Sequence, residues 1–322
     1  MVSYVIRRLL GLIPTLFIIT VIVFALMHLM PGNAFQALIG LNPQIKDAAK
    51  VIAQREANAG LNLSYPQQYV NWIVNLLHGN LGTSLEFQEP VSTLIGIALP
   101  NTVTLAFTAE LIILIIGIPV GVFQANRANK GFDVATSLLA VFLYSVPAFV
   151  FALFLIFLFS FTLNWLPSMG TVTAAVPWSG DLGDRLQHLI LPAVALALPS
   201  VAYYTRLMRA NTLQVFFQDY VRTARAKGLR SARVLFRHVL RNAIIPITTQ
   251  FGFDIGGLVG GAVILEQIFT WPGMGELTIN ANLNRDYPVI LATTLIFAVM
   301  VLLGNLFADI LLASMDPRVR YN

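Results

Sequence analysis

Few side chains in this sequence of 322 residues could do covalent or redox chemistry. Cysteine is absent, which excludes disulfides, thiolate metal sites and thiol catalysis. The histidines show no paired metal-ligand spacing: His28, His78, His188 and His238. No G-x-x-x-x-G-K-[ST] phosphate loop occurs, and Ser145 and Ser168 lack the context of a hydrolase nucleophile. The sequence therefore predicts no catalytic residue, no metal site and no cofactor in this chain.

Three acidic residues, Glu110, Asp254 and Asp309, lie inside long apolar stretches. A charge at the centre of a membrane helix costs about 2.5 to 3.5 kcal/mol, so each is expected to face protein or water. Two interpretations of Glu110 and Asp254 stay open: they line a path through the membrane, or they are protonated or hydrogen-bonded and hold helices together. Asp309 is expected to pair with a basic residue such as Arg318. A membrane protease built on these acids is disfavoured, because no H-E-x-x-H or G-x-S-x-G pattern accompanies them.

The densest run of cations lies between Asp219 and Arg241. Its first part has an acid in the first turn and cations before Gly228, which is typical of a short helix that stops at the glycine. Ser231 is expected to cap a second helix, one face of which carries Arg233, Arg237 and Arg241. A rigid helix pair of this kind can transmit a displacement to the membrane helices on either side.

Simpler interpretations of these cations also stay open. They could fix the orientation of the chain in the membrane, or bind anionic lipid head groups at about 1 kcal/mol per cation. Nucleic acid is not expected as a partner, because the helix pair would lie against the bilayer and lacks a second recognition surface.

The elements that must position these residues are membrane helices. Hydrophobic residues make up 57% of the chain and charged residues only 11%, against about 25% charged in soluble domains. Leu9 to Leu29 is long enough to cross a hydrocarbon core of about 30 Å and too long for the apolar part of a signal peptide. Five further spans are predicted at 101–123, 134–163, 188–208, 242–265 and 288–312.

Six spans place both termini on one side of the membrane. That side carries most of the 20 Lys and Arg residues, so the positive-inside rule predicts cytoplasmic termini. The chain then divides into residues 1–30, an extracytoplasmic cap segment 31–100 and a five-span core 101–322 with a cytoplasmic loop at 209–241. Within the cap, helical periodicity is expected at 43–58 and 66–77.

Small and kinking residues interrupt several spans. Five glycines cluster in the fifth span and predict close helix approach or sliding against a partner: Gly252, Gly256, Gly257, Gly260 and Gly261. Pro119 and Pro147 predict kinks. No inverted repeat is visible, which disfavours a stand-alone secondary transporter.

The segment around Gly228 resembles the cytoplasmic loop of the membrane permeases of bacterial ATP-binding-cassette (ABC) importers. Their general motif is Glu-Ala-Ala, three residues, then Gly, and Arg222-Thr223-Ala224 stands here in the place of Glu-Ala-Ala. The peptide-transport branch has a closely similar run. Other runs look like the B-type subunit of dipeptide and oligopeptide permeases: Tyr69–Trp72, His78–Ser84, Leu166–Pro167, Glu266–Phe269, Trp271–Gly275, Asp286–Pro288 and Asp316–Arg318.

The resemblance implies an all-α type I ABC importer fold in a bacterial or archaeal plasma (inner) membrane. It implies a second, C-type permease, two ATPase subunits that hold ATP and Mg²⁺, and an external solute-binding protein that delivers peptide. On this basis the ATPase contact is expected at Arg222, Thr223, Ala224, Arg225, Ala226, Lys227, Gly228, Leu229, Arg230 and Ser231. Glu110 and Asp254 would attract the amino terminus of a passing peptide. Permeases for nickel, glutathione or oligosaccharides share the loop pattern, so these substrates remain alternatives.

Overall fold

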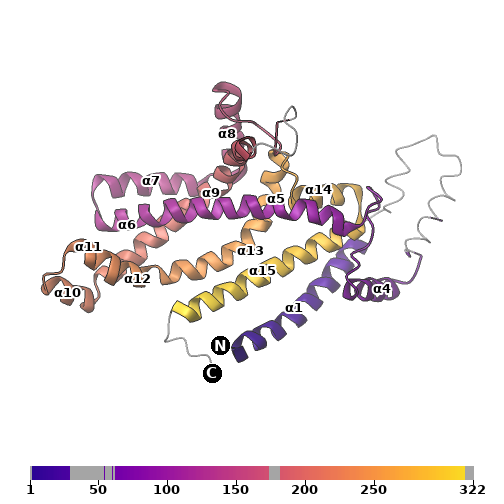
Figure 1. Cartoon of the computed structure of the whole chain (residues 1–322), viewed down its shortest axis with the longest axis horizontal. Helices are drawn as coiled ribbons and strands as arrows, with labels where there is room; N and C mark the ends of the chain where they lie inside the picture. The colour runs from indigo at the N-terminus through magenta and orange to yellow at the C-terminus, as the bar shows by residue number, and fades with distance from the viewer. Residues whose placement is uncertain (1, 30–53, 55–59, 61, 174–181, 316–322) are drawn as a thin grey trace.

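The computed structural model describes residues 2–29, 54, 60, 62–173 and 182–315. Long helices form an elongated bundle, with α4 and α14 (Met274–Asn284) towards one end and α10 (Asp219–Ala226) and α11 (Ser231–Arg233) at the other (Figure 1). The described part of the chain contains no strand, so the predicted all-α class is confirmed there. The cap helix predicted at 43–58 lies outside the described residues. The one predicted at 66–77 is α4 (Tyr65–Leu77).

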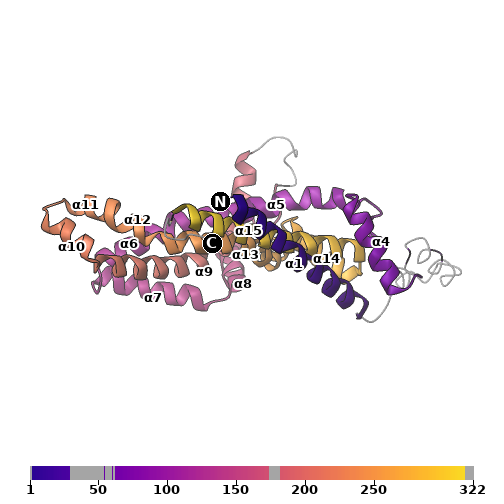
Figure 2. The same cartoon turned by 90° about the horizontal axis from the view of Figure 1, so that it is seen from below.

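The longest helices run along the bundle and supply most of its core. They are α1 (Val2–Leu29), α5 (Val91–Ile112), α9 (Leu182–Phe216), α13 (Ile245–Ile268) and α15 (Tyr287–Met315). Helix α1 lies outside, against α15 (Figures 1 and 2). Helix α9 is central, because it packs against α5, α7 (Gly131–Ser145), α8 (Ala148–Leu155) and α13. The α9 side chains Tyr204 and Met208 are fully buried.

A single helical column continues α5 through a π-helical turn, η1 (Ile113–Gly117), into α6 (Ile118–Asn126). Pro119 follows this turn. Proline lacks an N–H group and its ring crowds the preceding turn, which accounts for the local widening. A Cβ on Gly121 would lie 2.7 Å from the Met208 Cβ, so this glycine allows α6 and α9 to approach closely.

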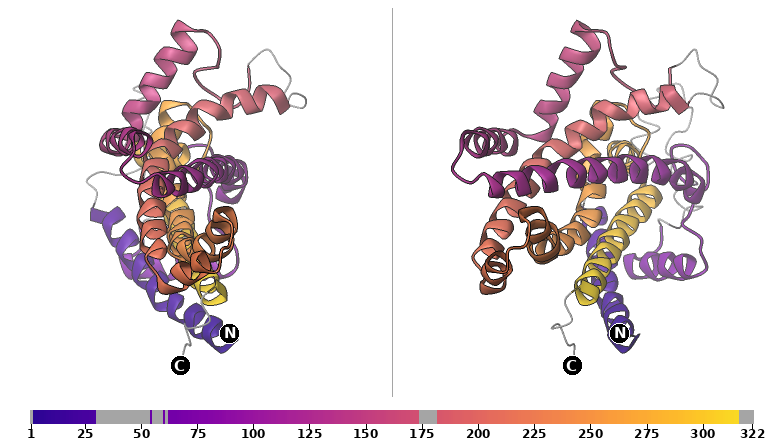
Figure 3. Two further views of the ribbon diagram at one scale, coloured as in Figure 1. Left: turned by 90° about the vertical axis from the view of Figure 1, so that its left-hand side faces the viewer. Right: turned by 60° about the vertical axis from the view of Figure 1, so that its left-hand side comes forward.

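The stretch predicted as one span at 134–163 is broken. Helix α7 (Gly131–Ser145) ends before Pro147, and α8 (Ala148–Leu155), continued by η2 (Ile156–Thr162), leaves it at a bend of 100°. Val146 has φ −90° and ψ 128°, the extended conformation favoured before proline. Proline is expected to kink this span, and the structure shows a full break after which α8 runs in a different direction from α7 while still packing against α9 (Figures 1 and 3).

Four helical segments in the described residues are long and apolar enough to cross a membrane alone, and the bent pair makes up to five. The four are Leu10–Leu29, Val91–Asn126, Leu182–Phe216 and Tyr287–Leu312. Helix α13 packs along α15. Its 24 residues cover about 36 Å at about 1.5 Å per residue.

Candidate functional site

The segment around Gly228, which the sequence predicts to be cytoplasmic, is a compact set of short helices after α9. Helix α10 (Asp219–Ala226) ends before Gly228, whose φ of +74° is the left-handed conformation that favours glycine. The chain then enters α11 (Ser231–Arg233), η3 (Val234–Val239) and α12 (Leu240–Ala243). The two helices and the glycine stop are as predicted. Ser231 is instead the first helical residue, and the helix has no side-chain cap.

This segment has its own small core, which fixes the two helices against each other. Val221 and Ala224 of α10 pack against Val234 and Val239 of η3, and all four side chains are buried. Most of the predicted contact residues are exposed, with Ala224 buried and Leu229 half-buried as the exceptions. The segment is therefore a rigid projection with a polar surface, which Figure 2 shows beyond the ends of α6 and α9.

The exposed face of this projection is strongly basic. The Arg222 guanidinium lies 3.7 Å from the Asp219 carboxylate, and the Arg225 guanidinium lies 5.1 Å from the centre of the Phe216 ring. Five further cations have no acidic partner among the described residues: Lys227, Arg230, Arg233, Arg237 and Arg241. Partial burial raises the pKa of the Tyr220 hydroxyl, which therefore stays neutral on this face.

The two central membrane acids come together between α5, α9 and α13. Glu110 is 5% exposed, neither of its carboxyl oxygens has a hydrogen-bond partner among the described residues, and it interacts electrostatically with Asp254. The Tyr204 hydroxyl is fully buried beside both acids and contacts the Asp254 carboxyl, although no hydrogen bond of normal geometry joins the two groups. An unsatisfied buried polar group costs about 1 to 3 kcal/mol, so this cluster needs an explanation.

A chain of polar contacts leads from this cluster to the surface of the bundle. The Gln250 amide donates to an Asp254 carboxyl oxygen at 2.8 Å, and the Tyr203 hydroxyl donates to the Gln250 carbonyl at 3.4 Å. Tyr203 is stacked on Tyr144 of α7, with ring centres 6.4 Å apart. These two tyrosines face a cavity of about 670 Å³ between α7 and α9, lined by Ser137, Val141, Tyr144, Tyr203, Arg206, Leu207, Arg209 and Ala210.

The third membrane acid, Asp309 of α15, is not part of this cluster, since the acid that interacts with Glu110 is Asp254. Its predicted partner Arg318 lies outside the described residues.

Comparisons with known proteins agree with this geometry. Residues 117–321 match the family described as the inner membrane component of binding-protein-dependent transport systems, and residues 1–106 match its N-terminal component. The chain belongs to this family. It is a permease subunit of an ABC importer.

Relatives of the permease match it from end to end. The oligopeptide transport system permease protein AppB of Bacillus subtilis (strain 168) is 43% identical over 322 residues, which is 100% of both chains. The glutathione transport system permease protein GsiC of Escherichia coli (strain K12) is 38% identical over 321 residues, again 100% of both chains. A solved structure of the inward-facing MetNI methionine ABC transporter shares the fold. It has a TM-score of 0.57 at 15% identity and covers 69% of this chain and 96% of that chain.

The glycines of α13 divide into two groups in the permease. A Cβ on Gly252 would lie 2.7 Å from the Ala308 backbone nitrogen, and one on Gly256 would lie 2.6 Å from the Val301 Cα, so both face α15. A Cβ on Gly257 or Gly260 would meet nothing within 4 Å. The surroundings of Gly261 are outside what the structure describes. Close packing is thus present within the chain, and the open glycines face away from α15.

Two buried acids outside the predicted site hold loops of the permease in place. Glu266 is fully buried and accepts hydrogen bonds from the Thr102 hydroxyl at 2.6 Å and the Gly275 N–H at 2.6 Å. Asp286 is 1% exposed and accepts from the Ser84 hydroxyl and the Leu85 N–H. Sequence reasoning had identified these runs only as family markers. The sequence does contain a signal for the role of Glu266: the acid lies in an apolar stretch, and two glycines, Gly273 and Gly275, follow it closely.

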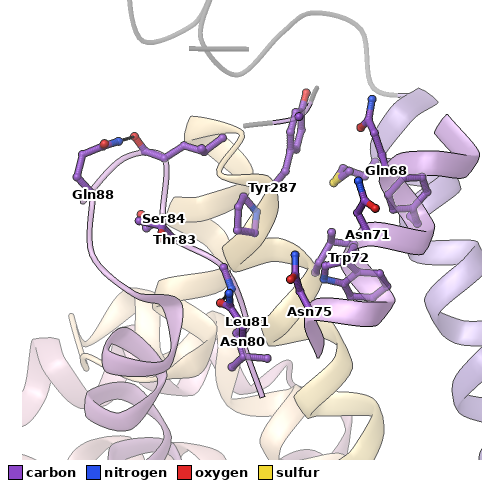
Figure 4. A pocket seen from close by; sticks show the side chains of 17 residues that line it. Gln68, Asn71, Trp72, Asn75, Asn80, Leu81, Thr83, Ser84, Gln88 and Tyr287 are labelled. Atoms are coloured by element: carbon purple, nitrogen blue, oxygen red, sulfur yellow. Dashed lines mark hydrogen bonds between the residues drawn. The ribbon is translucent and has the colours of Figure 1, made fainter. Parts of the chain in front are cut away.

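A second cavity, of about 590 Å³, lies next to Asp286 at the α4 end of the permease (Figure 4). Helix α4 contributes Asn71, Trp72 and Asn75 to one wall, and the loop carrying Ser84 and Gln88 forms the opposite wall. Among the described residues that line this cavity, none has a charged side chain.

Proposed function

We propose that this chain is the B-type permease of a peptide importer. It pairs with a second, homologous permease, two ATPase subunits dock inside, and a solute-binding protein delivers peptide from outside. The observation that carries the proposal is the end-to-end match, at 43% identity, to a protein named as an oligopeptide permease. ATP and Mg²⁺ are then bound by the ATPase subunits.

The charge and the rigidity of the basic projection support its assignment as the surface that contacts the ATPase. Its exposed cations lack acidic partners within the described chain, so they are available to an acidic surface of another subunit. Because Val221 and Val234 lock its two helices together, a push on α10 is passed to α9 and α13, between which it is connected. The proposed contact runs from Arg222 to Ser231.

We place this projection in the cytoplasm of an inner-membrane protein with six spans and cytoplasmic termini. The five apolar spans, counting the bent pair, and α13 together supply six. The excess of Lys and Arg on the side of α10 supports this orientation.

Site-specific crosslinking tests the contact, and the absence of native cysteine makes it practical. In the assembled complex, Ala226→Cys or Ser231→Cys is expected to crosslink to an ATPase subunit carrying a cysteine-reactive probe. Gln88→Cys, at the opposite end of the bundle, is the matched control and is expected to give no such product. If neither Ala226→Cys nor Ser231→Cys crosslinks in an assembled complex, the proposed contact is wrong. Uptake of labelled di- and tripeptides by the reconstituted complex tests the substrate.

Glutathione is the second candidate substrate, because a glutathione permease is 38% identical over the whole chain. Uptake of glutathione with no uptake of ordinary tripeptides would replace the first assignment. Nickel or oligosaccharide uptake is tested in the same assay.

A further inference from the structure

The cavity between α7 and α9 is lined by two cations, Arg206 and Arg209, and a cluster of acids lies behind the wall that Tyr203 forms. The acid cluster of Glu110 and Asp254 reaches it through Gln250 and Tyr203. Arg206 lines the same cavity directly, is exposed, and has no acidic partner among the described residues. Only two hydrogen bonds and one turn of α9 separate the acidic end from the basic end.

Several features distinguish this arrangement from ordinary helix packing. The Glu110 carboxyl is 5% exposed, and neither of its oxygens has a hydrogen-bond partner among the described residues, although Tyr204 of α9 and Asp254 of α13 lie nearby. Groups that only hold helices together are expected to be paired with each other. The neighbouring Arg209, by contrast, is used structurally, since its guanidinium binds the Asp133 carboxylate at 2.6 and 2.7 Å.

We infer that these residues form a two-ended binding site for a zwitterionic solute on the transport path. The ammonium group is held at the end formed by Glu110, Tyr204 and Asp254. The carboxylate is held by Arg206, and the main chain lies on the stacked rings of Tyr144 and Tyr203. This inference rests on the proposed function, because a short peptide with free termini has one charge of each sign at its ends.

The chemistry of each end suits the group assigned to it. An ammonium group has three donors and no acceptor, so it can satisfy carboxyl oxygens that lack donors in the chain. A guanidinium has five donors in a fixed fork and binds a carboxylate through two of them. The rings of Tyr144 and Tyr203 offer apolar contact area, which suits a path that accepts many side chains.

Charge-selective labelling tests the two ends without any substrate. In the assembled complex, Gln250→Cys is expected to react faster with a cationic than with an anionic methanethiosulfonate, and Ala210→Cys, beside Arg206, is expected to show the reverse. A rate ratio of about tenfold corresponds to about 1.4 kcal/mol. Adding Glu110→Gln should remove the first preference, and adding Arg206→Gln the second. Equal rates for both reagents at both cysteines would overturn the inference.

Uptake by the reconstituted importer, with its binding protein, tests the substrate. Each variant's rate is divided by the wild-type rate for the same peptide, so the preference of the binding protein cancels. Asp254→Asn is expected to slow a free tripeptide about tenfold more than its N-acetylated form, again about 1.4 kcal/mol. Arg206→Gln is expected to slow the free tripeptide more than its C-terminal amide.

Matched controls separate a specific effect from a general defect. Asp309→Asn removes another acid from an apolar helix, and Lys130→Gln removes an exposed cation outside the cavity. Both are expected to change free and blocked peptides equally. If Asp254→Asn and Arg206→Gln also do so, the two-ended site is wrong. If the wild-type complex transports none of the peptides while the labelling preferences hold, the peptide assignment fails and the two-ended site stands.

Discussion

The Glu266 carboxylate is buried at the point where α13, α5 and α14 (Met274–Asn284) meet. It receives the Thr102 hydroxyl and the N–H groups of Gly275 and Glu276, at 2.6, 2.6 and 3.2 Å. The two N–H groups belong to the first turn of α14, where a negative charge is favoured by the helix dipole. Gly273 and Gly275 leave room for the carboxylate, because a Cβ on either would collide with it.

Replacing this carboxylate by an amide removes charge and places a donor against other donors. Glu266→Gln is therefore expected to destabilise the chain by about 1.5 to 3 kcal/mol, the usual worth of hydrogen bonds to a charged group. The measurement is the midpoint of thermal unfolding of the purified complex in detergent. Glu276→Gln is the control: that side chain accepts none of these bonds, although burial raises its pKa. Equal stability of the Glu266→Gln and Glu276→Gln variants would contradict this role.

Sequence reasoning found the charged residues at this scale but not all of their partners. It located Glu110 and Asp254 inside spans, because a carboxyl group in an apolar run stands out. It could not show that Tyr204 lies beside both, since that depends on how α5, α9 and α13 pack. The roles of Glu266 and Asp286 were missed for the same reason, because the hydroxyl groups that donate to them, on Thr102 and Ser84, lie more than a hundred residues away in the sequence.

At the scale of elements, α13 and α15 approach closely along a glycine face. Gly252 and Gly256 of α13 meet α15 at Ala308 and Val301, and a Cβ on Gly304 of α15 would lie 2.8 Å from the Gly256 nitrogen. This geometry explains why small residues recur four apart on α13. Gly257 and Gly260 are not part of this contact.

Alanine substitutions distinguish the two sets of glycines. Gly252→Ala is expected to push the α13 and α15 backbones apart and to cost about 1 to 3 kcal/mol, as overpacking does. Gly257→Ala meets no atom of the chain within 4 Å and gains helix propensity, so it is expected to be neutral or slightly stabilising. Thermal unfolding of the isolated permease measures both. A larger loss of stability for Gly257→Ala than for Gly252→Ala would show that the closely packed face of α13 is the one that carries Gly257.

The positions of most helices followed from hydrophobic runs and stop signals, and the exceptions have local causes. The glycine stop after α10 was predictable because Gly228 takes a left-handed conformation that other residues resist. The break at Pro147 was predictable as a kink, but its 100° angle was not. That angle depends on the packing of α8 against α9, which no local signal contains.

At the scale of the whole molecule, the bent pair decides the topology. If α7 and α8 together cross the membrane, the segment around Met169 lies outside and α10 lies inside with six spans. If they turn back instead, Met169 lies inside and α9 then carries α10 to the outside. The second arrangement separates α10 from any cytoplasmic ATPase, so the proposed function requires the first.

Cysteine labelling in intact cells separates these topologies, because the chain has no cysteine of its own. Met169 is 59% exposed and is a suitable position. We expect Met169→Cys and Gln88→Cys to react with a membrane-impermeant maleimide added outside, and Lys227→Cys to react only after the membrane is permeabilised. The Lys227→Cys variant also controls for leakage of the reagent. Labelling of Met169→Cys only after permeabilisation would mean that α7 and α8 re-enter on the cytoplasmic side, and it would remove both the sixth span and the cytoplasmic position of α10.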